Sequence, residues 1–111
     1  MDKIWPMKNI NKCCTFGERL RTLRQKSGLT LKEVAKSIEI DTSLLAKIER
    51  DERIPTKLLI ITIADYFKVD AKELINEFMS DQIAYKILDE ESDIDILKVA
   101  EKKFKYRITK H

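Results

Sequence analysis

Regularly spaced helix-start signals constrain the fold of this chain more than any other feature of its sequence. Three residue pairs have the capping-box spacing, in which two side chains satisfy free backbone amides at a helix start: Thr15 with Glu18, Thr30 with Glu33, and Asp70 with Glu73. Thr56 marks a fourth start, and Asp41 or Thr42 marks another. The 111 residues include only two Gly and two Pro, and 37% are charged, which is typical of long polar helix faces. We therefore expect an all-α fold.

Apolar residues recur at helical spacing in each expected segment. We expect five helices, at residues 15–26, 31–38, 42–50, 57–67 and from about 71 onward. The fifth either continues through Ile87 or breaks near Ser80, and the pattern leaves both open. The helix at 57–67 is apolar almost all round, which predicts a central core helix. The two short helices at 31–38 and 42–50 are joined by a tight turn, which predicts a helix-turn-helix.

The C-terminal part of the chain has its own pattern. After the acidic stretch Asp89–Asp93 we expect a last amphipathic helix that carries Ile94, Leu97, Ala100 and Phe104 and ends in a basic tail. Acid at a helix start and base at its end complement the helix dipole, and the tail could also contact phosphates. The expected organisation is an N-terminal arm at 1–14, a helical domain at 15–79 and a C-terminal helical extension at 80–111.

The formal net charge of +3 is unevenly distributed. Residues 1–53 hold 12 Lys and Arg against 8 Asp and Glu, whereas residues 54–111 hold 10 against 11. The basic excess is therefore N-terminal. Because basicity alone is weak evidence for a polyanion partner, the placement of the charges matters more than their sum.

Cysteine usage and hydropathy indicate a cytoplasmic protein. Adjacent Cys13 and Cys14 suit neither an ordinary disulfide nor a zinc site, since the only His is His111. We expect no metal and no cofactor. The N-terminal residues lack the long apolar core of a signal peptide, and the longest apolar stretch, Leu58–Ala64, is too short to span a bilayer, so no membrane association is expected.

Residues 42–50 combine a short apolar seam with a small, polar and basic face. Leu45 and Ile48 belong to the seam. The opposite face has side chains that suit base edges and thymine methyl groups in a major groove: Thr42, Ser43, Ala46 and Lys47, with Arg50 at its end. An ordinary solvated face could have the same composition, so this helix alone leaves both interpretations open.

Glu49 is an acid on the core side of the same helix. An unpaired carboxylate there would cost several kcal/mol of desolvation, about the cost of any buried lone charge. Arg24 lies four residues after Leu20, on the buried stripe of the first helix. We expect Arg24 and Glu49 to form an ion pair, with two separate surface charges as the alternative.

The run from Phe16 to Leu74 resembles the lambda-repressor-like helix-turn-helix of the Cro/CI (XRE) family of bacterial and phage regulators. The landmarks "GLT", "IER" and "P" occur in the family's order and spacing. The resemblance implies a five-helix DNA-binding domain with 42–50 as the recognition helix, in which Thr42, Ser43 and Lys47 read bases. It also implies the ion pair of Arg24 with Glu49. Phosphate contacts are expected from four residues: Arg53, with Arg50 and Lys57 nearby, and Lys32.

Three positions depart from the family's pattern. Leu31 stands where the family usually has a Gln that contacts phosphate, and Lys32 could compensate. Glu39 replaces the Gly usual in the turn, at a strain of about 1 kcal/mol. Asp51 replaces the Gly usual after "ER", and with Glu52 it puts two acids near the expected phosphate path. We expect these acids to lower DNA affinity.

Family members usually dimerise, and the C-terminal extension is the expected dimer element, because its apolar residues exceed what a five-helix core needs. The dimer candidates are Ile83, Ile87, Ile94, Leu97 and Phe104. Packing within one chain is the alternative for these residues. Ile4, Trp5 and Met7 in the N-terminal arm could dock on the core or contact a partner subunit. Leu44 could pack on a neighbouring helix or contact DNA.

The predicted function is sequence-specific binding of double-stranded DNA by a homodimeric transcriptional regulator, without a small-molecule ligand. The stretches "IDTSLLAKIERDERIPTK" and "VDAKEL" look most like regulators found beside DNA methyltransferase genes, so control of a restriction-modification system is one setting. The alternative is an adaptor or antitoxin-like module with the same fold. An enzyme is poorly supported, because the sequence has no Gly-rich phosphate loop and its Cys pair has no base partner.

Overall fold

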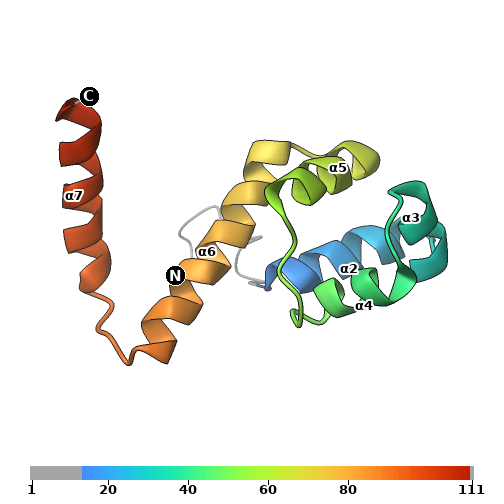
Figure 1. Ribbon diagram of the computed structural model, residues 1–111, viewed down its shortest axis with the longest axis horizontal. Helices are drawn as coiled ribbons and strands as arrows, with labels where there is room; N and C mark the ends of the chain where they lie inside the picture. Colours follow the sequence, from blue (N-terminus) through green and yellow to red (C-terminus); the bar gives the residue numbers. More distant parts are fainter. Residues whose placement is uncertain (1–13, 111) are drawn as a thin grey trace. The chain divides into compact units, whose positions relative to one another are not determined.

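The computed structural model describes residues 14–110, and these residues form helices without any strand. The helices are α2 (Phe16–Lys26), α3 (Leu31–Ser37), α4 (Thr42–Glu49), α5 (Lys57–Phe67), α6 (Ala71–Asp89) and α7 (Ile96–Lys110) (Figure 1). The predicted all-α class is confirmed. No helix within residues 14–110 has the length and apolar composition needed to cross a membrane. Ile4, Trp5 and Met7 lie outside the described residues.

The predicted capping boxes form at the starts of α2 and α3. Thr15 Oγ1 accepts a hydrogen bond from Glu18 N at 3.2 Å, and Glu18 Oε1 accepts one from Thr15 N at 3.1 Å. Thr30 and Glu33 make the same reciprocal pair, at 3.1 and 2.8 Å. Each box satisfies two amides that a helix start leaves without partners. The starts of these two helices are therefore set by hydrogen bonds between residues three positions apart.

Five consecutive helices, α2 to α6, end in the same way. A residue one or two positions after the end of each helix has a left-handed backbone with φ between 53° and 70°: Gly28, Glu39, Asp51, Lys68 and Glu91. At each end, two amides turn back onto carbonyls of the last helical turn, for example Ile40 N to Ala35 O at 2.9 Å and Glu39 N to Lys36 O at 3.2 Å. This is the Schellman arrangement. Only one of the five residues is Gly, so the chain makes its sharp turns mostly with strained charged residues.

The chain divides into two compact units, Met1–Asp81 and Gln82–His111. The boundary falls inside α6, which runs unbroken through Ser80. Of the two possibilities that the sequence left open, the longer helix is therefore correct.

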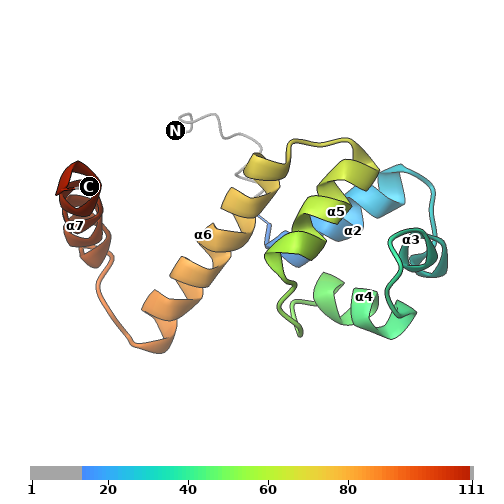
Figure 2. The same cartoon turned by 45° about the horizontal axis from the view of Figure 1, so that its top comes forward.

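The first unit has one apolar core to which α2 to α6 all contribute. Its buried hydrophobic side chains are Phe16, Leu20, Val34, Ala35, Ile38, Leu45, Ile48, Ile60, Ile63, Ala64 and Leu74. α4 packs against both α2 and α3, and α2 lies between α4 and α5 in Figure 1. In the turned view of Figure 2, α5 passes in front of α2. The rings of Phe16 and Phe78 meet edge to face, with centroids 5.6 Å apart. Burial of each large side chain contributes about 1.5–3 kcal/mol before entropy is counted.

α5 corrects one sequence prediction. Its composition, apolar almost all round, predicted a central core helix, but its buried residues are Ile60, Ile63 and Ala64, whereas Leu58 is 73% exposed and Ile61 is 39% exposed. The helix therefore covers one side of the core and turns its other side to solvent. Composition counts apolar residues but does not say which face has a neighbour.

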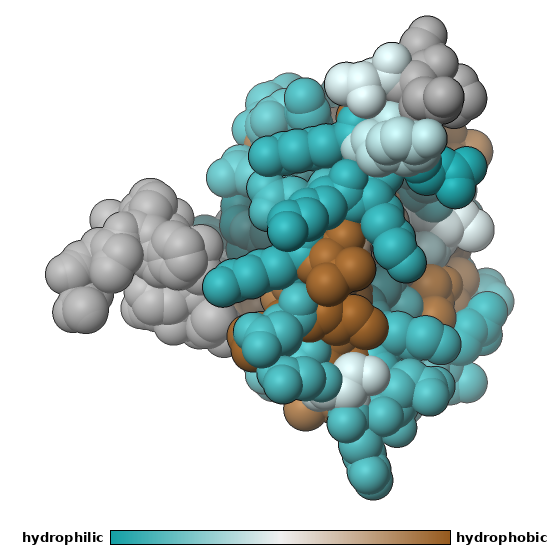
Figure 3. Space-filling model, turned by 90° about the vertical axis from the view of Figure 1, so that its left-hand side faces the viewer, coloured by the Kyte–Doolittle hydropathy of each residue, from teal (hydrophilic) through white to brown (hydrophobic). Residues whose placement is uncertain are grey.

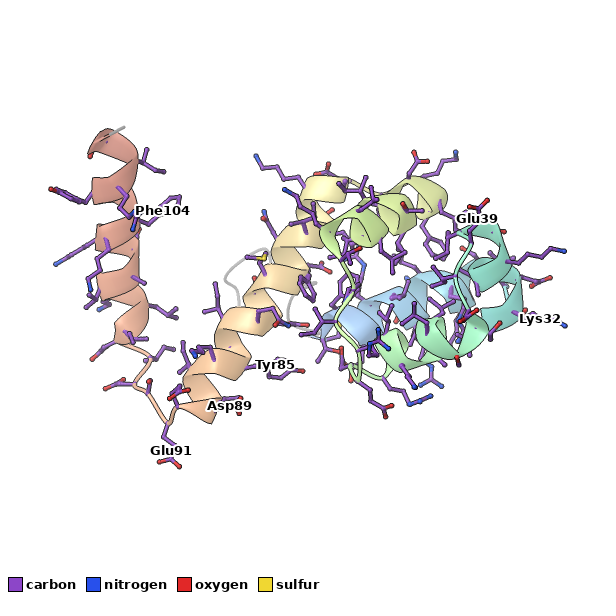
Figure 4. All side chains as sticks on the ribbon, viewed as in Figure 1. Lys32, Glu39, Tyr85, Asp89, Glu91 and Phe104 are labelled. Atoms are coloured by element: carbon purple, nitrogen blue, oxygen red, sulfur yellow. The ribbon has the colours of Figure 1, made fainter. Side chains whose placement is uncertain are left out.

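The second unit has no buried side chain among residues 82–109. Exposed large hydrophobic residues follow one another along α7: Ile96, Leu97, Val99, Phe104, Tyr106 and Ile108. Figure 4 shows Phe104 projecting from this helix. Ile94, expected inside the last helix, lies before its first residue and is 69% exposed. The second unit thus carries much apolar surface and buries none of its side chains fully.

Candidate nucleic-acid interface

α4 is fixed on one side and accessible on the other. Leu45 and Ile48, at 0% and 1% exposure, hold it to the core, and Leu44 is partly buried against the same core. The packing interpretation of Leu44 is therefore correct. The four residues predicted to read bases are accessible: Thr42, Ser43 and Lys47 are exposed and Ala46 is half-buried.

The turn between α3 and α4 sets how the two helices meet. Glu39 has φ of 59°, so it adopts the left-handed conformation expected at this position despite its side chain. Asp41 precedes α4 in an extended conformation, and its side chain makes no capping hydrogen bond. Leu31, which replaces the expected Gln, packs partly buried against the core. The two helices therefore form the predicted helix-turn-helix.

Arg24 and Glu49 form an ion pair between α2 and the end of α4. Arg24 Nε and Nη2 donate to the two Glu49 carboxylate oxygens at 2.7 and 3.0 Å, and Arg24 Nη1 donates to Leu29 O at 3.0 Å. The side chains are 12% and 5% exposed. The hydrogen bond to Glu49 raises the pKa of Arg24, and so does the negative charge. A forked, buried contact of this kind fixes the orientation of α4.

Two acids that are distant in the sequence accept hydrogen bonds from residues at the start of α2. Asp51 Oδ2 accepts a hydrogen bond from Thr15 Oγ1 at 2.6 Å, and Asp51 Oδ1 accepts one from Gly17 N at 3.0 Å. Asp81 Oδ2, from α6, accepts one from Phe16 N at 2.6 Å. Burial raises the pKa of Asp81 despite this hydrogen bond. Asp51, expected to be an acid near the phosphate path, is therefore engaged in capping α2.

Gly17 permits this contact between α2 and α4. A Cβ atom at this position would lie 2.6 Å from each of three atoms: Asp51 Oδ1, Glu49 O and Ile48 O. Two of these atoms are backbone, so no side-chain rotation would relieve the clash. Sequence reasoning missed this role. The available signal was a Gly in the first turn of a capped helix, where it lowers helix propensity.

The second expected acid, Glu52, is also paired. Arg50 Nε and Nη2 donate to its two carboxylate oxygens at 3.0 and 3.1 Å, and both side chains are 54% exposed. The hydrogen bond from Arg50 lowers the pKa of Glu52. The other residues predicted to contact phosphate are exposed: Lys32, Arg53 and Lys57. Figure 4 shows Lys32 on α3 with its side chain extending away from the helix.

Two further features concern ligands and partners. Among residues 14–110, no three His, Cys, Asp or Glu side chains come together to hold a metal ion. Of the predicted dimer residues, Ile83, Ile94, Leu97 and Phe104 are exposed, and Ile87 is half-buried.

The sequence pattern of a helix-turn-helix domain family matches residues 17–77. This chain belongs to that helix-turn-helix family. The resemblance inferred from the residues themselves is thereby confirmed. The match includes nearly all of α2, continues through α5 and ends inside α6, before the second unit begins.

Three relatives have names of the same kind. YazB of Bacillus subtilis, an HTH-type transcriptional regulator, is 37% identical over 59 residues, which cover 53% of this chain and 86% of YazB. DdrOP3 of Deinococcus deserti is 35% identical over 60% of this chain and 54% of its own length, and ImmR of Bacillus subtilis is 32% identical over 57% and 50%. Both are also named HTH-type transcriptional regulators. The match to this chain covers about half the length of DdrOP3 and of ImmR.

Proposed function

We propose that this protein is a transcriptional regulator that binds double-stranded DNA as a homodimer, with α4 of each subunit in the major groove of one half of an inverted repeat. The observation that carries this proposal is the accessible face of α4, held in place by Leu45, Ile48 and the Arg24–Glu49 ion pair. A small, polar and basic face on a rigid helix suits a groove that displays donors, acceptors and methyl groups. Membership of the helix-turn-helix family supports the same function.

Within this proposal the accessible residues have two roles. Thr42, Ser43, Ala46 and Lys47 read base edges, whereas the cations around α4 contact phosphates and set its position. The phosphate contacts are Lys32, Arg53 and Lys57, with Arg50 once a phosphate replaces Glu52 at its guanidinium. Because Asp51 is engaged at the start of α2, it opposes the approach of DNA less than a free acid would.

A two-fold symmetric dimer would place two α4 helices about one DNA turn, roughly 34 Å, apart. The exposed apolar residues of the second unit support such a dimer, because solvent-exposed hydrophobic clusters commonly mark interaction surfaces. The setting that we propose is control of restriction-modification genes, on the sequence likeness of residues 40–57 and 69–74 to such regulators.

Selection from a pool of random DNA duplexes at near-physiological salt tests the proposal. We expect the bound fraction to be enriched in an inverted repeat whose half-sites are about one helical turn apart. Retention that depends on salt but yields no preferred sequence would contradict sequence-specific binding. It would favour the protein-interaction adaptor instead.

Two substitutions separate the proposed roles. Lys47→Ala should change the preferred sequence, whereas Arg53→Ala should weaken binding to all sequences alike and reduce the salt slope by about one unit. Lys72→Ala, which removes an exposed Lys from the first turn of α6, is the matched control and should change neither property. Equal effects of all three substitutions would show that α4 does not read DNA.

A further inference from the structure

α7 carries an apolar stripe that is accessible along its whole length. At 3.6 residues per turn, five residues fall within about a third of the helix circumference: Ile96, Leu97, Ala100, Phe104 and Ile108. All five are exposed, the large ones between 40% for Leu97 and 63% for Phe104. Figure 3 shows one face of the molecule on which apolar side chains are surrounded by hydrophilic ones.

We infer that this stripe is covered by α7 of a second copy of the chain, and that the two helices run antiparallel. The inference rests on the homodimer proposed above and names the element and the geometry that hold it together. Two independent observations support it: the order of side-chain sizes along the stripe and the distribution of charge.

Four of the five stripe residues pair with one another when the stripe is reversed, and the fifth, Leu97, lies beside the partner's Arg107. When two antiparallel helices cross at Lys102, Ile96 lies beside the partner's Ile108, because the two are equally distant from residue 102. Ala100 lies beside the partner's Phe104 for the same reason. A small residue then faces a large one, which allows the side chains of the two helices to interdigitate. A parallel pair would instead place Phe104 against the partner's Phe104 and Ala100 against the partner's Ala100.

The distribution of charge along the chain also favours antiparallel α7 helices. The segment 89–95 contains five acidic residues, whereas α7 contains six Lys and Arg against one acid, Glu101. With the helices crossing at Lys102, an antiparallel pair places Asp93 and Asp95 at the level of the partner's Lys110. A parallel pair would align acid with acid and base with base, and like charges side by side are unfavourable. The two-fold axis makes both contacts equivalent, so the assembly closes as a dimer.

Disulfide formation tests the direction of the two helices in the full chain, with Cys13 and Cys14 replaced by Ser. Three variants are compared under mild oxidation: Ile96→Cys, Ile108→Cys and the double substitution. In the antiparallel pair the two introduced thiols of either single variant are about 18 Å apart along the axis, beyond the reach of a disulfide, whereas the double variant brings position 96 to the partner's position 108. We expect at least tenfold more cross-linked dimer from the double variant than from either single one.

Efficient cross-linking of either single variant would show parallel helices and overturn the inference. Absence of cross-linking in all three would overturn it as well, in favour of α7 packing within its own chain. Circular dichroism and thermal melting of each variant show whether it remains folded.

DNA binding by the same samples separates this inference from the proposed function. Binding to the selected inverted repeat without any cross-link contradicts the α7 pair and leaves the DNA-binding function standing. Cross-linking of the double variant alone, without retention of any duplex, leaves the α7 pair standing and contradicts the function.

Discussion

The two compact units of this chain use apolar residues in opposite ways. In residues 14–81, hydrophobic side chains from successive helices are buried together, and the acids Glu49, Asp51 and Asp81 each have a partner from another element. In residues 82–109, Ile, Leu and Phe side chains occur at a similar density, yet none of them is buried. The first unit therefore has the core of a self-sufficient domain, whereas the second has the composition of half an interface.

Two Leu→Ala substitutions measure this difference directly. Leu45→Ala removes a fully buried side chain and should lower the free energy of unfolding by about 3–5 kcal/mol, because it leaves a cavity in the core. Leu97→Ala, at 40% exposure, should lower it by less than about 1 kcal/mol at protein concentrations too low for dimers. Urea unfolding followed by circular dichroism measures both. Equal losses would mean that the two units share one core.

The Arg24–Glu49 pair gives the next largest effect. Glu49→Ala leaves the guanidinium of Arg24 buried without its carboxylate and should cost about 2–4 kcal/mol. Replacement of both residues, as Arg24→Met with Glu49→Leu, should recover most of that loss, because neither partner then remains as a lone charge. Glu52→Ala breaks an exposed pair and should leave unfolding unchanged. A double replacement as unstable as Glu49→Ala would show that hydrogen bonding to Leu29, rather than charge pairing, is the main contribution.

Two residues with a left-handed backbone allow a matched comparison in which the expected change in stability is smaller. Glu39, between α3 and α4, and Glu91, between α6 and α7, have φ of 59° and 53°. Glu39→Gly should stabilise the first unit by roughly 1 kcal/mol, because Gly adopts this conformation without strain. Glu91→Gly should not change the unfolding of that unit. Thermal melting detects both results, and destabilisation by Glu39→Gly would mean that the flexibility gained by the unfolded chain outweighs the relief of strain.

Asp81, at the boundary between the units, should give the smallest effect. Its pKa is raised by burial in the folded state, so its contribution to stability is present below its unfolded pKa and is lost as the pH rises through the folded one. Asp81→Asn keeps an acceptor for Phe16 N but does not titrate. We therefore expect the stability of the Asn variant relative to the parent to increase as the pH rises from below the unfolded Asp pKa of about 3.9 to neutral pH. Urea unfolding across that range measures the difference, and a constant difference would contradict the assignment.

Much of the first unit could be predicted because its signals are local. Capping boxes at Thr15 and Thr30 act over three residues, and the buried stripes follow from helical periodicity. The Arg24–Glu49 pair was also predictable, because each residue shares a face with core Leu or Ile residues and an acid there requires a cation. The candidate site followed from the same reasoning, since the face of α4 that does not contact the core is the face left for a ligand.

Other features were not predictable from pattern because they depend on residues far apart in the chain. The link from Asp81 to the amide of Phe16 spans 65 residues, and nothing in the sequence near either residue indicates the other. Exposure of Leu58 on α5 depends on which neighbours surround that helix. The need for Gly17 depends on how closely α2 approaches the carbonyls at the end of α4.

The amino-acid sequence by itself determined the approximate positions of the helices, the faces that α2, α3 and α4 bury and the polar, basic side of α4, because these depend on residues within one or two helical turns of each other. Tertiary structure alone decided that Asp51 and Asp81 are engaged at the start of α2 and which side of α5 is left exposed. In particular, we expected Asp51 to hinder DNA binding. Its carboxylate instead caps α2, because folding brings the end of α4 against the start of α2. The sequence shows which charges are present, but their effect depends on the groups that the fold places within hydrogen-bonding distance.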